Sequence, residues 1–263
     1  MSANIVWINN LSKVLTEGTL HRPRGMLVRE VLNNTSIVYM GRPVVTSIDR
    51  KMGFRFMAAE AHWILSGDNR VETIAPYSKE ISRFSDDGYR FQGAYGPKVT
   101  EQLNYVVETL INDPDSRQAV LTIWRENPRG SKDIPCTISL QFFIRNGEIH
   151  TIANMRSSDL WLGWVYDVFN FTMITAWVAL RYRERGMGLC GLGYLYLNAG
   201  SQHIYERNFE ACEKIVRDNI AWSYSPLSLS SFDSPSHLMS HLVALRDRDW
   251  ANVCHLKELQ QHV

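Results

Sequence analysis

Two stretches in the middle of the chain alternate apolar and polar positions. They are residues 137–145 (TISLQFFIR) and 148–159 (EIHTIANMRSSD), separated by Asn146-Gly147. An Asn-Gly pair between two alternating runs is the strongest short-range signal for a β-hairpin. The hairpin would place Cys136, beside the start of one strand, next to the Arg156–Asp159 run at the end of the other.

Other segments have helical spacing and recognisable stops. Expected helices cover residues 53–66, ended by Gly67; 99–112, ended by Asp113-Pro114; 166–185, ended by Gly186; and 237 to about 259, with Ser234 as cap and Pro235 in the first turn. Short strands are expected at 119–124 and 192–196, and the Ser/Pro-rich residues 222–236 predict a loop. Because helices are mixed with an antiparallel hairpin, we expect an α+β fold in which a mixed sheet is packed with helices.

Composition narrows the class of protein. The 263 residues are 45% hydrophobic, enough for one large core, and we expect a single domain over residues 1–263. There are 28 basic and 27 acidic residues, so nothing draws the whole chain toward nucleic acid or an anionic membrane, and any phosphate site must be local. No apolar run approaches the ~20 residues that span a bilayer.

The cysteines indicate the compartment. Cys136, Cys190, Cys212 and Cys254 form no CxxC pair and no metal-like spacing with histidine, so we expect no metal site. No secretion signal is visible at the N-terminus. Free thiols in such a chain indicate a reducing compartment, and we expect a cytoplasmic protein.

Candidate chemistry gathers around Cys136. Arginine neighbours such as Arg117 and Arg156 favour the reactive thiolate, and Arg156-Ser157 at a strand end can hold a phosphate. Each residue also has a plainer interpretation. A free cysteine is usually a small buried hydrophobe, Arg117 can be a solvated charge, and Arg156 can pair with Asp159 in an ordinary turn.

Further polar residues also have both a functional and a plainer interpretation. Glu60 lies among apolar residues, which would raise its pKa toward the range of acid/base catalysis, although a glutamate on a helix surface is commoner. His203 and Tyr205, two apart in an extended segment, point to the same side and can bind a sugar hydroxyl or form a pair at a sheet edge. Asp167 opens a helix, where an acid commonly complements the dipole.

Taken together and in order, these segments resemble the thymidylate synthase superfamily. The resemblance covers roughly residues 20 to 210 and depends on the order and spacing of several strings. The strings are EAHWILSGD (60–68), GAYG (93–96), NDPDSR (112–117), PC (135–136), RSSD (156–159) through Gly163, and HIY (203–205).

The resemblance implies a role for each matching position. Cys136 would be the nucleophile that adds to C6 of a pyrimidine nucleotide, Tyr95 would assist removal of the C5 proton, and Glu60 would organise water and proton transfers. The residues that would hold the nucleotide's phosphate and sugar are Arg24 (or Arg22), Arg156, Ser157, His203, Tyr205 and Arg117 of the partner subunit. The residues that would contact 5,10-methylene-tetrahydrofolate are Glu60, Ile81, Phe84, Asp159, Gly163 and Tyr166. The superfamily also implies a homodimer formed through one face of the sheet.

One departure from the superfamily's pattern concerns the base. Thymidylate synthases carry an asparagine four residues after the glycine that matches Gly163, and its amide reads the uracil edge; here this position is Asp167. A carboxylate only accepts hydrogen bonds, so it suits the amino group of cytosine, and N3–H once the attacked ring is protonated. Asp167 would also stabilise the charge that develops on that edge. Asn170 would take this place only after a three-residue slip that the Arg156-to-Gly163 match does not support.

A second departure follows the nucleophile, where Thr137 replaces the usual histidine. Cys136-Thr137, Asp167 and residues 198–207 (NAGSQHIYER) are similar to phage-type deoxycytidylate hydroxymethylase, in which water captures the exocyclic methylene intermediate. Ile81 and Phe84 would stand in place of the aromatic pair that flanks the folate, and loss of a tryptophan there would admit water. Gln118 replaces the second of two adjacent arginines, and the C-terminal tail that closes over folate has no clear counterpart.

The resemblance therefore implies a homodimeric enzyme that transfers a one-carbon unit from methylene-tetrahydrofolate to C5 of dCMP, through a Cys136–C6 adduct, and gives 5-hydroxymethyl-dCMP. The alternatives are a dCMP 5-methyltransferase that releases dihydrofolate, an enzyme for CMP, and a catalytically silent nucleotide-binding homologue. The retained Cys136, Glu60 and Tyr95 argue against the last, since binding alone needs none of them.

Overall fold

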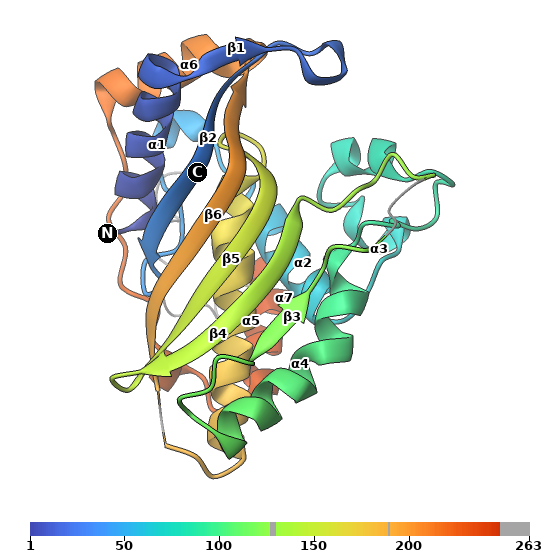
Figure 1. Ribbon diagram of the computed structural model, residues 1–263, viewed down its shortest axis with the longest axis vertical. Coiled ribbons are helices and arrows are strands. Elements are labelled where there is room, and N and C mark those ends of the chain that lie inside the picture. The colour runs from blue at the N-terminus through green and yellow to red at the C-terminus, as the bar shows by residue number, and fades with distance from the viewer. Residues whose placement is uncertain (127–129, 189, 248–263) are drawn as a thin grey trace.

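A six-stranded mixed sheet forms the centre of the structure, a computed structural model that describes residues 1–126, 130–188 and 190–247 (Figure 1). The strands lie in the order β1-β2-β6-β5-β4-β3. Their bounds are β1 Thr19–His21, β2 Val28–Tyr39, β3 Val120–Thr122, β4 Thr137–Arg145, β5 Glu148–Asp159 and β6 Gly191–Tyr205. The helices are α1 Ala3–Glu17, α2 Phe54–Leu65, α3 Val71–Ile74, α4 Tyr95–Asn112, α5 Trp164–Glu184, α6 Phe209–Asp218 and α7 Pro235–Arg246. Short 3₁₀ turns include η1 Pro23–Gly25, η2 Ile48–Arg50 and η3 Lys79–Phe84.

The predicted hairpin is confirmed as β4 and β5, which pair antiparallel from Arg145 and Glu148 to Thr137 and Met155, with a register shift between Thr137 and Ser139. Asn146 and Gly147 have φ values of 52° and 75°. Both lie in the left-handed region that the favoured two-residue hairpin turn requires. The chain then crosses through α5 and returns as β6, which pairs parallel with β5. The expected α+β fold with a mixed sheet is therefore confirmed.

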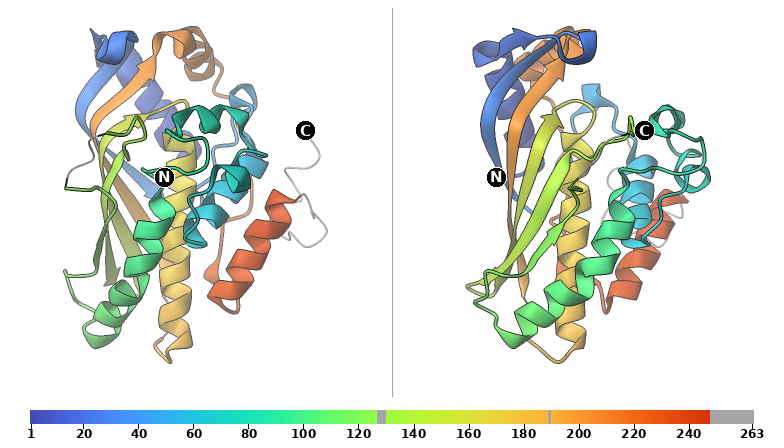
Figure 2. Two further views of the ribbon diagram at one scale, coloured as in Figure 1. Left: turned by 90° about the vertical axis from the view of Figure 1, so that its right-hand side faces the viewer. Right: turned by 45° about the vertical axis from the view of Figure 1, so that its right-hand side comes forward.

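Helices cover one face of the sheet and leave the other face open (Figure 2). On the covered side, α5 is buried on nearly all sides, because it packs against β5 and β6 as well as against α2, α4 and α7. On the open side, large apolar side chains such as Ile37, Ile138 and Tyr194 are exposed. We refer to this surface, the outward side of β2, β6, β5 and β4, as the open sheet face.

Most predicted elements exist, with shifted ends. The expected helices at 53–66, 99–112 and 166–185 are α2, α4 and α5, of which α4 begins four residues earlier and α5 two. The strand at 119–124 is reduced to β3. The short strand predicted at 192–196 was wrong in length, since β6 runs on to Tyr205 without a break. The last helix begins with Ser234 accepting the His237 N–H, as predicted, and its part beyond residue 247 lies outside the described residues.

The N-terminal helix α1 and the long strand β2 were not predicted. The buried positions of α1 include Ala3, Val6, Trp7, Leu11 and Val14, a helical period that the sequence did display. Trp7 Nε1 donates a hydrogen bond of 2.6 Å to the Leu160 carbonyl, just after β5. The missed helix thus supports the segment in which several of the candidate site residues lie.

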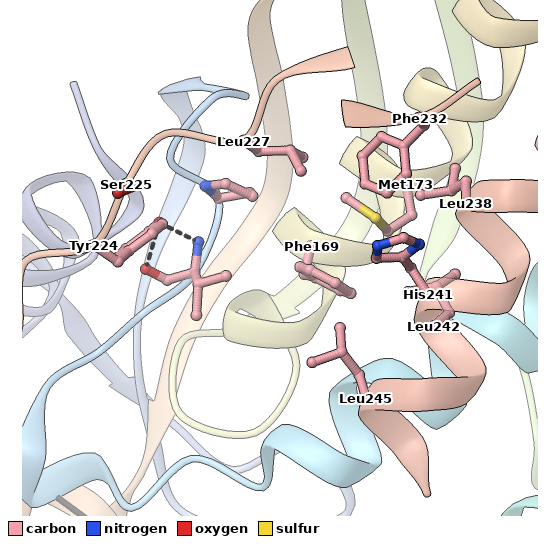
Figure 3. A pocket seen from close by; sticks show the side chains of 12 residues that line it. Phe169, Met173, Tyr224, Ser225, Leu227, Phe232, Leu238, His241, Leu242 and Leu245 are labelled. Atoms are coloured by element: carbon pink, nitrogen blue, oxygen red, sulfur yellow. Dashed lines mark hydrogen bonds between the residues drawn. The ribbon is translucent and has the colours of Figure 1, made fainter. Parts of the chain in front are cut away.

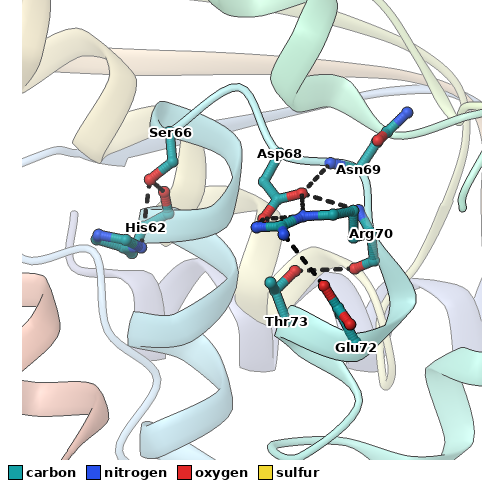
Figure 4. A network of polar contacts seen from close by, with 7 residues as sticks. All are labelled: His62, Ser66, Asp68, Asn69, Arg70, Glu72 and Thr73. Carbon is teal, nitrogen blue, oxygen red and sulfur yellow. Dashed lines mark hydrogen bonds and ion pairs between the residues drawn. The ribbon is translucent and has the colours of Figure 1, made fainter. Parts of the chain in front are cut away.

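A compact polar network follows α2 and leads into α3 (Figure 4). The Asp68 carboxylate accepts the backbone N–H groups of Asn69 and Arg70 at 2.7 and 2.9 Å and pairs with the Arg70 guanidinium at 2.9 Å. Thr73 closes the turn by donating to the Arg70 carbonyl. We call Asp68, Asn69, Arg70 and Thr73 the Asp68 network; it fixes the start of the segment that carries Ile81 and Phe84.

Candidate active site

The hairpin brings Cys136 beside Arg156 and Ser157, as the sequence predicted. The Arg156 N–H donates to the Cys136 carbonyl over 2.9 Å, and Ser157 Oγ donates to Cys136 Sγ over 3.6 Å. The Arg156 guanidinium is held in place by the Pro135 and Ile134 carbonyls, at 3.0 and 2.9 Å. The end of β5 therefore presents a fixed cation and a hydroxyl next to a half-buried thiol.

The ionisation of Cys136 differs from what its arginine neighbours alone suggest. Burial raises the pKa of the thiol, and the nearby Asp167 carboxyl adds to that shift. The charges of Arg156 and Arg24 and the Ser157 hydrogen bond favour the thiolate, but they do not outweigh burial. The arginines thus act in the predicted direction, but burial outweighs them and keeps the resting group a neutral thiol.

Tyr95 lies beside Cys136 at the start of α4. Thr137 donates to the Tyr95 hydroxyl oxygen twice, from its backbone N–H at 3.3 Å and from Oγ1 at 3.0 Å. Burial, with the nearby Asp167 and Cys136, raises the pKa of Tyr95 well above its ordinary value. Its oxygen therefore accepts two bonds as a neutral phenol, and its own proton is available to another acceptor. Thr137, seen in the sequence as a departure, thus has a direct contact in the site.

Two acidic side chains approach each other between α2 and α5. Burial raises the pKa of Glu60 to about 7, against a partial opposing effect of the hydrogen bond from Asn170 Nδ2, which is 2.7 Å from Glu60 Oε2. Burial also raises the pKa of Asp167 well above its ordinary value, and the charges of Glu60 and Asp159 act in the same direction. Of the two interpretations that the sequence left open for Glu60, the structure therefore has the one in which burial raises its pKa.

The parallel pairing of β5 with β6 brings together a second group of predicted site residues. Asp159 and His203 are direct register partners, and the His203 charge partly offsets the rise in the pKa of Asp159 that burial causes. Asp159 Oδ1 accepts the backbone N–H of Trp161 at 2.8 Å, while its buried Oδ2 has no partner among the described residues. Tyr205 packs edge-on against His203, with ring centroids 5.2 Å apart, so the two do lie on the same side.

The two arginines expected from other segments are placed differently. Arg24 lies in η1 with φ 53°, an uncommon backbone conformation for a residue other than glycine, and its charge acts on Cys136. Arg117 is exposed in the loop before β3, and its carbonyl accepts from Gln141 Nε2 at 2.8 Å. Gln141 is five residues along β4 from Cys136, on the order of 15 Å away. Within one chain, then, Arg117 lies well away from the cysteine.

Of the remaining predicted residues, Gly163 and Tyr166 border the same region, and no contact joins Ile81 or Phe84 to the site residues within the described part of the chain. Gly163 caps α5, where a Cβ would come within 3.3 Å of Asp167 Oδ2. The Tyr166 hydroxyl accepts the Gly53 N–H at 3.2 Å. Ile81 is half-buried in η3, and the ring of Phe84 is 50% exposed.

Arg50 was missed from the sequence. It is 8% exposed, donates to the Trp161 carbonyl at 2.7 and 3.1 Å, and lies over the rings of Trp161 and Tyr166. An arginine at the end of a short 3₁₀ turn carries no local signal of burial, so only the fold could reveal it. Over the described ranges, no group of histidine, cysteine and acidic residues could hold a metal ion, and no helix is long and apolar enough to cross a membrane.

A hollow on the other side of α5 has a different character (Figure 3). It is lined almost entirely by apolar side chains of α5, α7 and the segment before α7, including Phe169, Met173 and Leu242, with His241 at its edge. None of the residues that surround Cys136 takes part in it. The polar site and this apolar hollow therefore lie on separate sides of one helix.

Known proteins match most of this chain. The profile of the family described as Thymidylate synthase matches residues 6–236. A relative from Bacillus phage SP01, named deoxyuridylate hydroxymethyltransferase, is 29% identical over 237 residues, which cover 81% of this chain and 59% of the phage protein. A putative thymidylate synthase of Methanothermobacter thermautotrophicus is 27% identical over 222 residues, 80% of this chain and 94% of that protein.

The match extends over most of the chain and includes every segment that contributes to the site. The mixed sheet covered on one face by helices is the architecture expected for that family. The chain therefore belongs to the thymidylate synthase family, whose members transfer a one-carbon unit from methylene-tetrahydrofolate to C5 of a pyrimidine nucleotide.

Proposed function

We propose that this protein hydroxymethylates dCMP at C5, with 5,10-methylene-tetrahydrofolate as the one-carbon donor. The observation that carries the proposal is the position of Asp167. This acid lies near enough to Cys136, Tyr95 and Glu60 for its charge to affect them or be affected by them. A carboxyl thus lies within electrostatic range of the nucleophile, and it would meet the edge of a pyrimidine ring bound to that nucleophile.

The basic and hydroxyl groups around Cys136 support a nucleotide ligand. Arg156, Ser157 and Arg24 together offer charge-assisted donors to a 5′-phosphate. His203 and Tyr205, which lie on the same side at the end of β6, would bind the sugar 3′-hydroxyl. A phosphate seated here fixes the distance from the base to the thiol, which is the positioning that a bond between Sγ and C6 needs.

The protonation state of Asp167 suits attack on cytosine. Cys136 first releases its thiol proton to solvent. As the thiolate sulfur then bonds to C6, the C5=C6 π electrons move toward N3 and that nitrogen becomes basic. A protonated Asp167 carboxyl can donate its proton to N3 and then, as a carboxylate, accept from the N3–H and the amino group. An amide at this position has no proton of comparable acidity to give.

The folate supplies the methylene carbon when it is bound. Asp159 Oδ2, which is buried and has no partner in the described part of the chain, would accept a hydrogen bond from a flat heterocycle, and the exposed ring of Phe84 would stack on it. On the protein side, Tyr95 would assist removal of the C5 proton. Glu60, whose pKa lies near neutrality, would orient a water molecule and accept its proton.

A homodimer formed through the open sheet face would complete the phosphate site. Exposed Ile37, Ile138 and Tyr194 make this face more apolar than a solvated sheet surface needs to be. Since Arg117 does not reach Cys136 of its own chain, Arg117 of the partner subunit would add the further cation.

The test is mass spectrometry of the products from dCMP, CMP and dUMP, each incubated with methylene-tetrahydrofolate. The proposal expects dCMP to gain CH₂O, with tetrahydrofolate released. A gain of CH₂ with dihydrofolate formed would show a methyltransferase instead, and preferential turnover of CMP a ribonucleotide enzyme. No release of tritium from C5-labelled dCMP would contradict any catalytic role on this substrate.

A second candidate is hydroxymethylation of dUMP. Two observations favour it: the phage relative is named for deoxyuridylate, and a neutral Asp167 carboxyl has one donor and one acceptor, as the uracil edge does. The ratio of kcat/KM for dCMP and dUMP separates the two candidates.

A further inference from the structure

Asn170 lies at the point where α5 faces α2. It is 2% exposed and sits three residues after Asp167, so both side chains project from one face of α5. Its Nδ2 lies 2.7 Å from Glu60 Oε2, and the two residues are 110 positions apart in the chain. The contact is thus a tertiary one, made in a region from which water is largely excluded.

The two carboxyl groups near this amide, those of Glu60 and Asp167, differ in their hydrogen bonds. Glu60 accepts the Asn170 N–H, whereas no hydrogen bond from the described part of the chain favours the ionised form of Asp167, and burial and the neighbouring acids raise its pKa. Two neighbouring buried carboxyls cannot both ionise readily, so a donor to one of them determines which ionises first. The negative charge therefore goes to Glu60, and the proton stays on Asp167.

Other charges do not explain the difference. On the α7 side, Arg246 and Asp247 act on His62, two residues further along α2. From β5, Asp159 acts on Asp167 and further disfavours its charge. From the start of α4, Tyr95 is a neutral phenol. Asn170 is the side chain whose hydrogen bond favours ionisation of Glu60.

We propose that Asn170 is the positioning residue for Glu60: its amide fixes the orientation of the Glu60 carboxyl and decides that Glu60, not Asp167, carries the negative charge. The chemical value of this order rests on the proposed function, which needs a base at Glu60 and a proton at Asp167. The contact itself can be tested without any substrate.

The first experiment is an NMR titration of the full-length protein labelled with ¹³C at the glutamate carboxyls, with Glu60 assigned by its loss in Glu60→Gln. Asn170→Leu keeps the approximate shape of the side chain but removes the donor. Since a hydrogen bond to a charged group shifts an equilibrium about ten- to a hundredfold, the ionisation constant of Glu60 should fall at least tenfold. An unchanged midpoint in folded Asn170→Leu would overturn the proposal.

Thr172→Val is the matched control. Thr172 is fully buried on the same helix, and its hydroxyl donates only to the Val168 carbonyl, so the change is again polar to apolar without touching Glu60. It should leave the Glu60 midpoint where it is. A shift as large as that of Asn170→Leu would mean that any loss of polarity in α5 has this effect, and would also overturn the proposal.

A measurement on the wild-type protein tests the contact even if Asn170→Leu does not fold. The side-chain amide protons of Asn170 should change chemical shift with the same midpoint as the Glu60 carboxyl, and this response should vanish in Glu60→Gln. Amide protons that do not respond would contradict the contact. Failure to turn over dCMP would overturn the proposed function and leave these titrations unaffected, so the two failures are distinguishable.

Discussion

Two acids at opposite ends of one short segment, Glu60 within α2 and Asp68 just after it, show opposite behaviour. Asp68 is also partly buried, which opposes its ionisation, but the Arg70 guanidinium and backbone N–H groups more than compensate and lower its pKa to about 2. Glu60 faces the core with a single amide donor, and burial raises its pKa to about 7. A cation and several donors therefore make Asp68 a structural anchor, whereas desolvation with one uncharged donor leaves Glu60 able to exchange a proton near neutral pH.

The largest expected effect is the loss of catalysis in Glu60→Gln. A side chain that transfers a proton in the transition state contributes about 10²–10⁴-fold, so kcat for dCMP should fall by that range. Asp68→Asn, which changes an acid eight positions away to its amide, should alter kcat less than about threefold, since it touches no reacting group. Steady-state kinetics of both variants check the contrast, and comparable losses in the two would remove it.

The next effect concerns stability and pH. Because the folded-state pKa of Glu60 lies above its ordinary value of 4.5, the folded protein binds more protons than the unfolded chain between about pH 4.5 and 7. Its contribution to stability is complete below that window and is lost as pH rises through it, by up to about 3 kcal/mol.

In Glu60→Gln this part of the loss should be absent. Urea unfolding at pH 5 and pH 8 measures the free energy of unfolding of wild type and variant. Between pH 5 and pH 8, the free energy of unfolding of the variant should rise relative to that of the wild type by about 3 kcal/mol. A constant difference between the two proteins at both pH values would mean that Glu60 is not held in its neutral form.

A smaller effect is expected on base preference. Asp167→Asn exchanges an acid for an amide that cannot protonate N3, so the ratio of kcat/KM for dCMP over dUMP should fall at least about tenfold, or roughly 1.4 kcal/mol. Kinetics with both nucleotides measure the ratio. An unchanged ratio would show that the base is read elsewhere in the site.

The smallest effect is the stability loss in Asp68→Asn. Asp68 has a lowered pKa, so its contribution is present above about pH 3.8 and disappears as pH falls toward 2. At neutral pH the variant should lose about 1 kcal/mol, discounted because the Arg70 partner is half exposed. Thermal unfolding at pH 7 and pH 3 should show the difference narrowing at the lower pH.

Local chemistry was sufficient for much of the fold and for the first half of the site. Asn146-Gly147 predicted the turn that sets Cys136 beside Arg156 and Ser157, although a register shift between Thr137 and Ser139, which the sequence did not predict, adjusts the final pairing. The length of β6 was not predicted, because the glycines at 191, 193 and 200 interrupt its alternation. Pairing with β2 and β5 on both sides keeps the strand extended despite them.

The sequence by itself determined the hairpin, the main helices and the ordered strings that identify the family, because turns and periodicity depend on residues close together in the chain. Only the tertiary structure decided that Asp159 lies opposite His203, that Asn170 donates to Glu60, and that Cys136 is a neutral thiol. These properties depend on desolvation and on partners up to about a hundred residues away. The pKa of an acid on an apolar helix rises toward neutrality when another helix buries the acid without placing a cation beside it.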